Sequence, residues 1–433
     1  MARVIAVFLA VLSSAAEAQS LPPVQRIGPV LAISTEPLAA VSQVRSLPGG
    51  RVMVHDNTGR RVILLDTALK LLSIVADTTA ATAKAYGPTM SGLIQYRGDS
   101  TLILDADNLS MLVIDAGGKI VRTMAVPQPD EARYLIGGPF GTPGVDPLGR
   151  LVYKSRVGGM GKVVGVQKLG QPPPPPDKPD SAMVVRFDLQ TRKIDTLEKF
   201  VIPNYVQHSF QDANGWVTTT TVVNPLPWTD DWALLSDGTV AVVHGREYRV
   251  DFIDASSKVV RSSKVPFDWQ RLSDEDKAAV IDSARTAYAS AGVVRAAIDS
   301  ANAKADSGRL GSAMTNTSRA STGVTPTAIG RAAFRTSVRA YVSPEELPDY
   351  RPVFMQAASR GDEDGNLWIR TSKFVNGGAI YDVISSQGVL VARVQVPRGR
   401  TIAGFGSGGV VYMGVLDGTI ARVERVRWVP AKK

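Results

Sequence analysis

The chain has 433 residues, with 49 lysines and arginines against 40 aspartates and glutamates, and a formal net charge of +9. Hydrophobic residues make up 44% and charged residues 21%, as in ordinary globular proteins, so the composition excludes wholesale disorder. The lack of cysteine excludes disulfide scaffolds, thiolate zinc sites and a cysteine nucleophile. With 3 histidines in the whole chain, a multi-histidine metal centre is hard to build.

The first 18 residues have the layout of a secretory signal peptide. Arg3 supplies the positive start, Val4 to Leu12 form an apolar run, and Ala16-Glu17-Ala18 is a small-x-small cleavage site. We expect cleavage after Ala18 and export to the periplasm or the medium; the alternative is a buried N-terminal strand. The apolar run is shorter than the roughly 20 residues that cross a bilayer, and no later stretch approaches that length, so no transmembrane segment is expected. Scattered charge on an exported chain also argues against nucleic-acid binding.

A pattern of four short strands recurs along the chain. In residues 41–77 it reads VSQVRS, RVMVH, RRVILLD and KLLSIVA, separated by turns rich in Gly and Asp. Similar units follow at 91–127, 147–203, 231–266, 351–397 and 402–428. The last unit has only three strands, and the run Val24–Ser34 is a spare strand before the first unit.

Four-stranded repeats of about 40 residues are typical of β-propellers. A propeller closes its ring when an N-terminal strand completes the last blade, so the spare strand and the missing strand explain each other. The sequence therefore predicts an all-β fold: one six-bladed β-propeller over residues 19–433, closed by an N-terminal strand. Two β-sandwiches in tandem are the alternative.

Three segments carry a resemblance to a known family: GRVMVHD at 50–56, DGNLWIR at 364–370, and DGTVAVV at 237–243 with YRVDFID at 248–254. The pattern resembles six-bladed propellers of the NHL-repeat or TolB type. The third segment looks especially like exported bacterial propellers of unassigned function, in which a helical segment follows this blade. The resemblance implies the fold and says little about activity, because propellers host binding, scaffolding, hydrolysis and lyase chemistry.

Three long insertions interrupt the repeats, at residues 155–181, 204–231 and 267–350. With the strands of a blade named A to D from the axis outwards, all three fall in B–C or D–A connections, which share one face of a propeller. Decorated faces of rigid scaffolds often carry function. The first insertion contains five consecutive prolines, which favour an extended polyproline II segment.

The third insertion has a helical part and a basic part. Ser273 followed by three acidic residues is an N-cap signal, and the apolar spacing after it predicts one or two helices from Asp274 to about Ser307. Residues 307–344 hold arginines among Ser, Thr, Ala and Gly without one acid, which is typical of a flexible basic linker. Docking to an acidic surface is its functional interpretation.

Polar residues near the ends of the B strands predict a ligand site on the decorated face. Counted five residues after each A–B turn, the positions are His55, Asp105, Lys154, Val243, Arg370 and Gly414. Basic side chains there would surround an anionic group near the axis. The full set of candidate ligand-binding residues adds loop neighbours: His55, Asp105, Lys154, Arg156, Arg246, Arg370, Trp228, Asp230 and Asp231.

No recognisable catalytic set accompanies these residues. His55, His208 and His244 could act as general bases, but no G-x-S-x-G nucleophile motif is present. The leading hypothesis is a non-catalytic module without a cofactor that binds a protein or a small anionic ligand through the decorated face. The alternative is a calcium-dependent hydrolase or lactonase, which needs several carboxylate or Asn side chains converging on the channel. A structural partner of an envelope complex is a third possibility.

Overall fold

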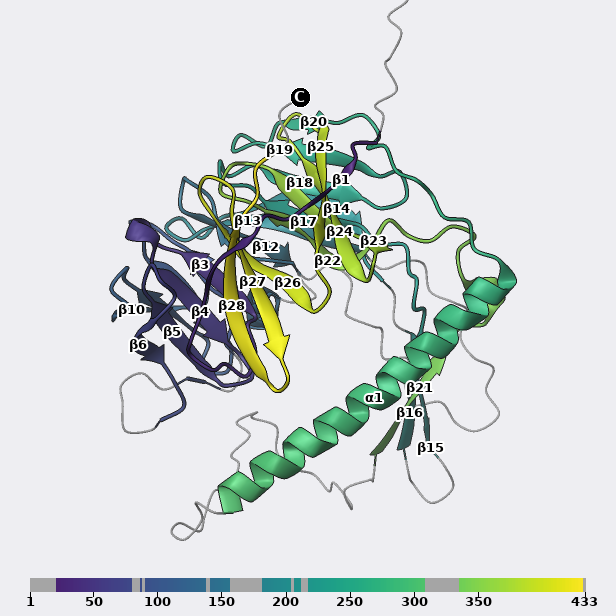
Figure 1. The fold of residues 1–433 in the computed structure, drawn as a ribbon, viewed down its shortest axis with the longest axis horizontal. Coiled ribbons are helices and arrows are strands. Elements are labelled where there is room, and N and C mark those ends of the chain that lie inside the picture. Colours follow the sequence, from purple (N-terminus) through teal and green to yellow (C-terminus); the bar gives the residue numbers. More distant parts are fainter. Residues whose placement is uncertain are drawn as a thin grey trace, which may run out of the picture.

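The strand repeats fold into six sheets arranged around a common axis (Figure 1). The computed structural model describes residues 21–79, 86–87, 90–137, 141–155, 181–203, 206–211, 217–307 and 335–430. Each sheet is one blade, and its strands follow one another from the axis outwards by antiparallel pairing. The prediction of a six-bladed propeller is confirmed.

The first three blades contain the following strands. Blade one has β3 (Gln43–Ser46), β4 (Val52–Asp56), β5 (Arg61–Leu65) and β6 (Leu71–Ala76). Blade two has β7 (Ile94–Gln95), β8 (Thr101–Asp105), β9 (Ser110–Ile114) and β10 (Ile120–Ala125). Blade three has β11 (Gly144–Val145), β12 (Arg150–Ser155), β13 (Ser181–Asp188) and β14 (Ile194–Val201).

The second half of the ring is built in the same way. Blade four has β17 (Asp231–Leu234), β18 (Val240–His244), β19 (Arg249–Ile253) and β20 (Val259–Arg261). Blade five has β22 (Phe354–Gly361), β23 (Leu367–Val375), β24 (Gly378–Ile384) and β25 (Leu390–Val396). Blade six has β26 (Arg400–Gly406), β27 (Val410–Asp417) and β28 (Ile420–Arg427). Short 3-10 helices lie at Pro48–Gly50, Pro129–Ile136 and Pro344–Glu346.

Aspartates close the turns between the third and fourth strands of several blades. Asp66 accepts hydrogen bonds from the backbone amides of Ala68 and Lys70, both at 2.8 Å. Asp115 in blade two and Asp254 in blade four bind the amides two and four residues on in the same way. An aspartate that accepts the backbone amides of its own turn is a local sequence signal. The repeats can therefore be detected in the sequence.

The ring is closed by the N-terminal segment, as predicted, but through two strands. β2 (Val30–Ile33) pairs antiparallel with β28 and completes blade six. β1 (Val24–Arg26) lies parallel to β25 at the outer edge of blade five. The run that the sequence presented as one strand is therefore divided between two neighbouring blades.

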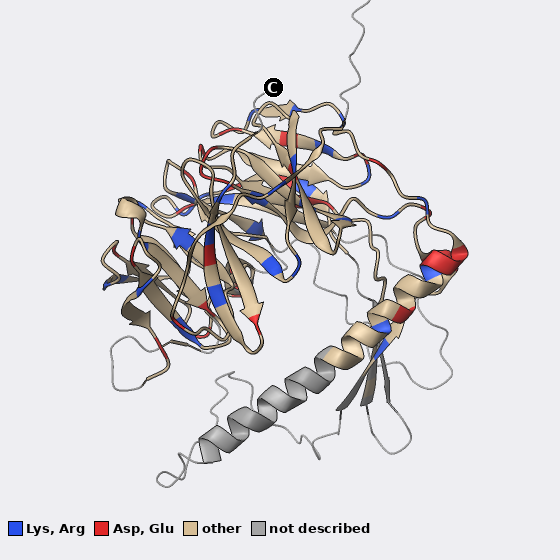
Figure 2. Ribbon diagram, viewed as in Figure 1, with Lys and Arg blue, Asp and Glu red and all other residues tan. Residues whose placement is uncertain are grey.

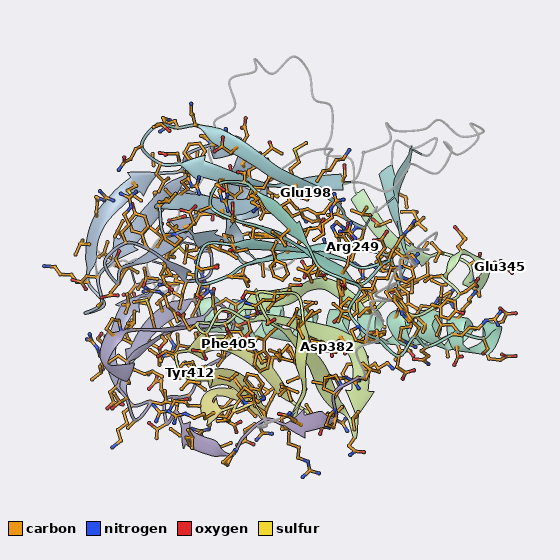
Figure 3. The ribbon with its side chains drawn as sticks, turned by 90° about the horizontal axis from the view of Figure 1, so that it is seen from above. Glu198, Arg249, Glu345, Asp382, Phe405 and Tyr412 are labelled. Atoms are coloured by element: carbon orange, nitrogen blue, oxygen red, sulfur yellow. The ribbon has the colours of Figure 1, made fainter. Side chains whose placement is uncertain are left out.

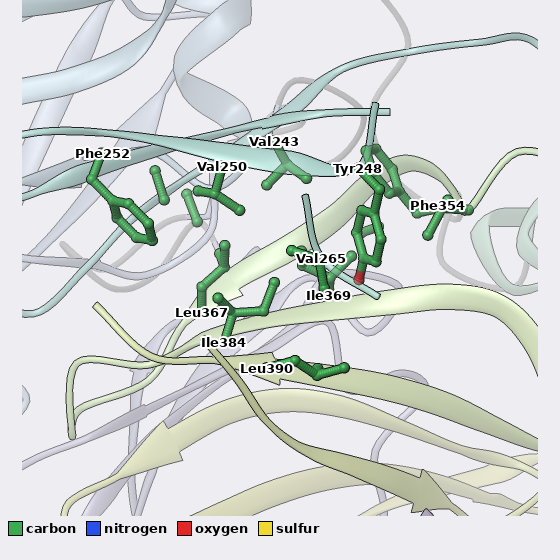
Figure 4. Packing of buried hydrophobic residues seen from close by; sticks show 14 of the residues in the cluster. Val243, Tyr248, Val250, Phe252, Val265, Phe354, Leu367, Ile369, Ile384 and Leu390 are labelled. Atoms are coloured by element: carbon green, nitrogen blue, oxygen red, sulfur yellow. The ribbon is translucent and has the colours of Figure 1, made fainter. Parts of the chain in front are cut away.

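The core lies between the blades, where the apolar faces of neighbouring sheets meet. Between blades four and five, Val243 and Val250 pack in one cluster with Leu367 and Ile384 (Figure 4). Tyr248 belongs to this cluster and donates its hydroxyl to Asp382 at 2.7 Å. Trp232 and Trp368 are among the largest fully buried side chains. Because each interface is filled in this way, the blades hold the axial strands in fixed positions.

The second and third insertions meet in a small subdomain (Figure 1). β16 (Val217–Val223) pairs antiparallel with β15 (Val206–Gln211) and parallel with β21 (Arg335–Tyr341). The predicted helix forms as α1 (Asp274–Ser307), whose first turn carries the expected acids (Figure 2). Tyr341 donates its hydroxyl to the carbonyl of Ala284 at 3.0 Å and so ties α1 to the sheet.

The prediction of a linker over residues 307–344 is wrong at its C-terminal end, where β21 forms a strand. β21 pairs with β16, which lies more than a hundred residues earlier, so no local pattern announces it. Residues 308–334, and residues 156–180 of the first insertion, lie outside the described residues. Over the described ranges, no helix is long and apolar enough to cross a membrane.

Candidate functional site: an arginine-lined axial channel

The innermost strands of the six blades enclose two adjoining cavities. The smaller one, of about 210 Å³, lies on the side of the D–A and B–C connections and is lined by residues that include Ser42, His55 and Asn57. The larger one, of about 420 Å³, is lined by residues of all six blades, among them Phe405, which Figure 3 labels. The two share Gln43, Thr142, Pro143 and Arg360, so they form one continuous space.

Arg360 lies where the two cavities meet. It belongs to β22, the innermost strand of blade five, opposite Trp368 of β23. Within the described part of the chain, its guanidinium forms no hydrogen bond and no ion pair. Burial lowers the pKa of Arg360, since desolvation disfavours the charged form. A half-buried guanidinium without a partner is a strong anion-binding group.

His55 of β4 faces the smaller cavity and is only 2% exposed. Its Nε2 shares a short hydrogen bond with the hydroxyl of Tyr86, and its Nδ1 is buried with no partner among the described residues. Burial lowers the pKa of His55 to about 4 and raises the pKa of Tyr86 to about 12. Both groups are therefore neutral at pH 7, and the free ring nitrogen can exchange a hydrogen bond with a ligand.

Asp231 fixes the strand that carries Arg360. Its carboxylate accepts the backbone amides of Ala358 at 2.7 Å and of Ser359 at 2.8 Å, which joins blade four to blade five. Burial raises the pKa of Asp231 to about 6, although these amides lower it. Asp231 was a predicted ligand-binding residue, and the structure places it behind the cavity wall as a positioning residue.

The other predicted residues of this region lie near the connections between blades. Asp230 accepts the amides of Val201 and Gly245, both at 3.0 Å. Trp228 packs against Trp269, with ring centroids 6.0 Å apart. Arg246 is exposed in the B–C loop of blade four, and Arg156 lies outside the described residues.

Lys154, Arg370 and Asp105 do not join His55 at the axis. Lys154 is buried between blades three and four, with its Nζ 5.8 Å from the centre of the Phe200 ring. Arg370 is exposed. None of the three lines either axial cavity. Of the predicted B-strand column only His55 lines an axial cavity, so the column as a whole does not converge on the channel.

Asp105 also stands one residue out of register with His55. It accepts the backbone amide of Asn108 at 3.2 Å, as Asp56 accepts that of Gly59 at 2.8 Å. Asp105 therefore corresponds to Asp56, and the residue that corresponds to His55 is Leu104. A shift of one residue moves a strand side chain to the opposite face of the sheet.

The sequence reasoning missed Arg45 and Arg360. Both are on innermost strands, and each stands two residues before the A–B turn of its blade. The signal was present in the sequence as an arginine in QVRS and in ASRG. The two arginines match when the A strands of the blades are aligned, and not when the B strands are aligned.

Two of the three carboxylates that line the channel, Asp146 and Asp362, are already bound to protein groups. Asp146 pairs with Arg150 at 2.7 Å, and Asp362 accepts the amide of Asn366 at 2.7 Å and the indole N–H of Trp368 at 2.8 Å. Across the described ranges, no group of three or more histidine or acidic side chains is placed to hold a metal ion. The carboxylate set expected for a calcium site is not found in this part of the chain.

Several solved structures are similar to this chain at low sequence identity. A virginiamycin B lyase from Staphylococcus aureus, with quinupristin, is 10% identical at a TM-score of 0.37, over 91% of this chain and 99% of that one. A gluconolactonase from Xanthomonas campestris is 10% identical at a TM-score of 0.36, over 94% and 97%. The calcium-binding protein regucalcin from Agrobacterium tumefaciens is 10% identical at a TM-score of 0.38, over 94% and 98%.

These similarities carry no information about the site at such identities and TM-scores. No protein-family model matches the chain, and no curated protein sequence matches it significantly. The finer resemblance to NHL-repeat or TolB propellers stays a prediction. The chain is a six-bladed β-propeller that resembles lyase, gluconolactonase and regucalcin structures at low identity.

Proposed function

We propose that this protein is a binding module for a small anionic ligand, which it holds in the axial channel. The observation that carries the proposal is Arg360, a half-buried cation at the junction of both cavities with no partner in the described part of the chain. His55 supports it, because this residue lines the same smaller cavity and its buried Nδ1 has no partner among the described residues. An anion there would satisfy both groups, and leaving such groups unpaired costs stability.

Isothermal titration of the mature protein with small anions at low ionic strength tests the proposal. The probes are acetate, lactate and inorganic phosphate. We expect Arg360→Gln to weaken binding by about tenfold or more, because a hydrogen bond to a charged group contributes about 1.5–3 kcal/mol. Arg246→Gln, which removes one exposed loop charge, is the matched control and should leave affinity within about twofold. Equal binding by wild type and Arg360→Gln would overturn the proposal.

A hydrolase or lactonase in the same channel is the second candidate. It is favoured by His55, which lines the smaller cavity and whose uncharged ring has a nitrogen without a partner among the described residues that could accept a proton. The calcium-dependent form of this hypothesis has no ligand set among the described residues. Turnover of gluconolactone that is lost in His55→Ala and survives chelation would put the enzyme ahead of the binding module.

Export to the periplasm or the medium also remains a proposal, based on the signal-peptide layout of residues 1–18. Mass spectrometry of the exported chain tests it, and we expect Gln19 as the first residue.

A further inference from the structure

We infer that the ligand of the channel is a dianion, gripped by Arg45 and Arg360 from two different blades. This inference rests on the proposed anion-binding function and adds a second anchor and a charge requirement. The ligand class is a small molecule with two acidic groups, or with one doubly charged group such as a phosphate monoester.

Arg45 and Arg360 occupy the same position in their blades. In blade one, Ser46 faces Val52 and Arg45 faces Met53. In blade five, Gly361 faces Leu367 and Arg360 faces Trp368. The two arginines therefore stand at the same level along the axis, and both line the larger cavity.

Small residues occupy most of the remaining positions at this level, where the innermost strands of neighbouring blades approach closely. The pairing of β11, β17 and β26 places Gly144, Ala233 and Gly404 there. All three line the larger cavity. Two cations with long side chains are thus set in a ring of residues too short to fill the channel.

Arg45 is buried, and among the described residues it has no carboxylate partner within hydrogen-bonding distance. It is 7% exposed, and its guanidinium donates to two neutral groups of blade two, the carbonyl of Asp99 at 3.2 Å and the hydroxyl of Thr101. Its Nε is buried with no partner among the residues described. Burial lowers the pKa of Arg45 to about 10, which leaves it charged at pH 7. Among the described residues, Arg45 and Arg360 are therefore two cavity-lining cations, buried and half-buried, whose charge no ion pair balances. Arg97 also lines the larger cavity but is exposed.

Glu363 is the one cavity-lining carboxylate in the described ranges that is not engaged by a turn or an ion pair. It is exposed at the end of the larger cavity and acts on Arg45 through its charge, without an ion pair to it. A dianion would compete with this carboxylate for Arg45. Removing the Glu363 charge should therefore strengthen dianion binding.

Titration with carboxylates of matched length tests the inference at low ionic strength. The probes are succinate and glutarate against butyrate and valerate, with inorganic phosphate and phosphoglycolate as a second arm. We expect wild type to prefer the dicarboxylates over the monocarboxylates by at least tenfold. Preference for phosphates over dicarboxylates would identify the second charged group as a phosphate and support the same two-arginine grip.

Variants separate the roles of the two arginines. Arg45→Gln should weaken dicarboxylate binding by at least tenfold more than monocarboxylate binding, whereas Arg360→Gln should weaken both classes. Glu363→Gln should tighten dicarboxylate binding severalfold, and Arg246→Gln should change neither class. If Arg45→Gln fails to fold, Arg45→Lys replaces it, and loss of the forked guanidinium should still reduce the preference.

The outcomes distinguish this inference from the proposed function. Equal affinity of wild type for monocarboxylates and dicarboxylates, or equal losses of both in Arg45→Gln, would overturn the dianion and leave anion binding at Arg360 intact. No binding of any probe would overturn both.

Discussion

Asp382 is a buried carboxyl group whose hydrogen bond contributes to the fold, although burial disfavours its ionised form. The side chain accepts the Tyr248 hydroxyl at 2.7 Å and lies 3.6 Å from Nε of Arg393 (Figures 3 and 4). Desolvation still dominates and raises the pKa of Asp382 to about 6. Asp231, behind the channel wall, shows the same shift from the same cause. In both cases the hydrogen bonds of the carboxyl group position neighbouring strands, and its burial makes the group harder to ionise.

These pKa values predict a loss of stability as the pH rises from about 4 to about 6. In that window the folded protein keeps protons that the unfolded chain releases, so the free energy of unfolding falls, by on the order of 3 kcal/mol for a shift of this size. Asp382→Asn should remove the part of this pH dependence of the free energy of unfolding that comes from Asp382, and leave the part that comes from Asp231. Urea unfolding between pH 4 and 7 measures it, with the exposed Asp417→Asn as control. Parallel curves for Asp382→Asn and wild type would contradict the assignment.

At the scale of elements, α1 begins where its capping residues dictate. Ser273 accepts the backbone amide of Asp276 at 3.2 Å through its hydroxyl, and its own amide donates to the Asp276 carboxylate at 3.0 Å. This reciprocal pair satisfies backbone groups that the first turn of a helix leaves free. Further along, Ile281 packs with Leu226, Leu272 and Leu347, which fixes the helix to the subdomain.

Ser273→Ala should therefore loosen the start of α1, with a cost of about 1 kcal/mol to the helix. Hydrogen exchange of the amides in residues 274–285 should speed up, while the melting temperature of the propeller stays unchanged. Ser283→Ala, at an exposed position within the same helix, is the matched control. Unchanged exchange in Ser273→Ala would show that tertiary contacts alone hold the helix end.

At the scale of the whole molecule, stability depends on a closure between the two ends of the chain. The backbone amide of Ser34 donates to the carbonyl of Val423 at 2.8 Å, and the Ser34 hydroxyl accepts the amide of Val423 at 2.9 Å. Ser34 is almost fully buried. Because every blade packs on two neighbours, opening this joint would expose two blade faces at once.

Ser34→Ala leaves the buried amide of Val423 without its side-chain acceptor and should cost about 1–3 kcal/mol. We expect the melting temperature to fall by several degrees, still in one cooperative transition. Circular dichroism in the near and far ultraviolet measures the unfolding. Thr401→Ala, on an exposed position of the same sheet, should melt like wild type. A second transition in Ser34→Ala would mean that blades unfold independently of ring closure.

The sequence by itself determined the blade count, the ring closure and α1, because alternating strands, Asp turns and a helix cap are local patterns. The sequence alone did not predict β1 and β21 as separate strands, because each pairs with a strand that is far away along the chain. Of the predicted site residues that the structure describes, only His55 lines the axial cavities. Arg45 and Arg360 line the same cavity only through the register of two separate sheets. Which side chains reach the axis was decided by tertiary structure, because a shift of one residue turns a strand side chain to the other face.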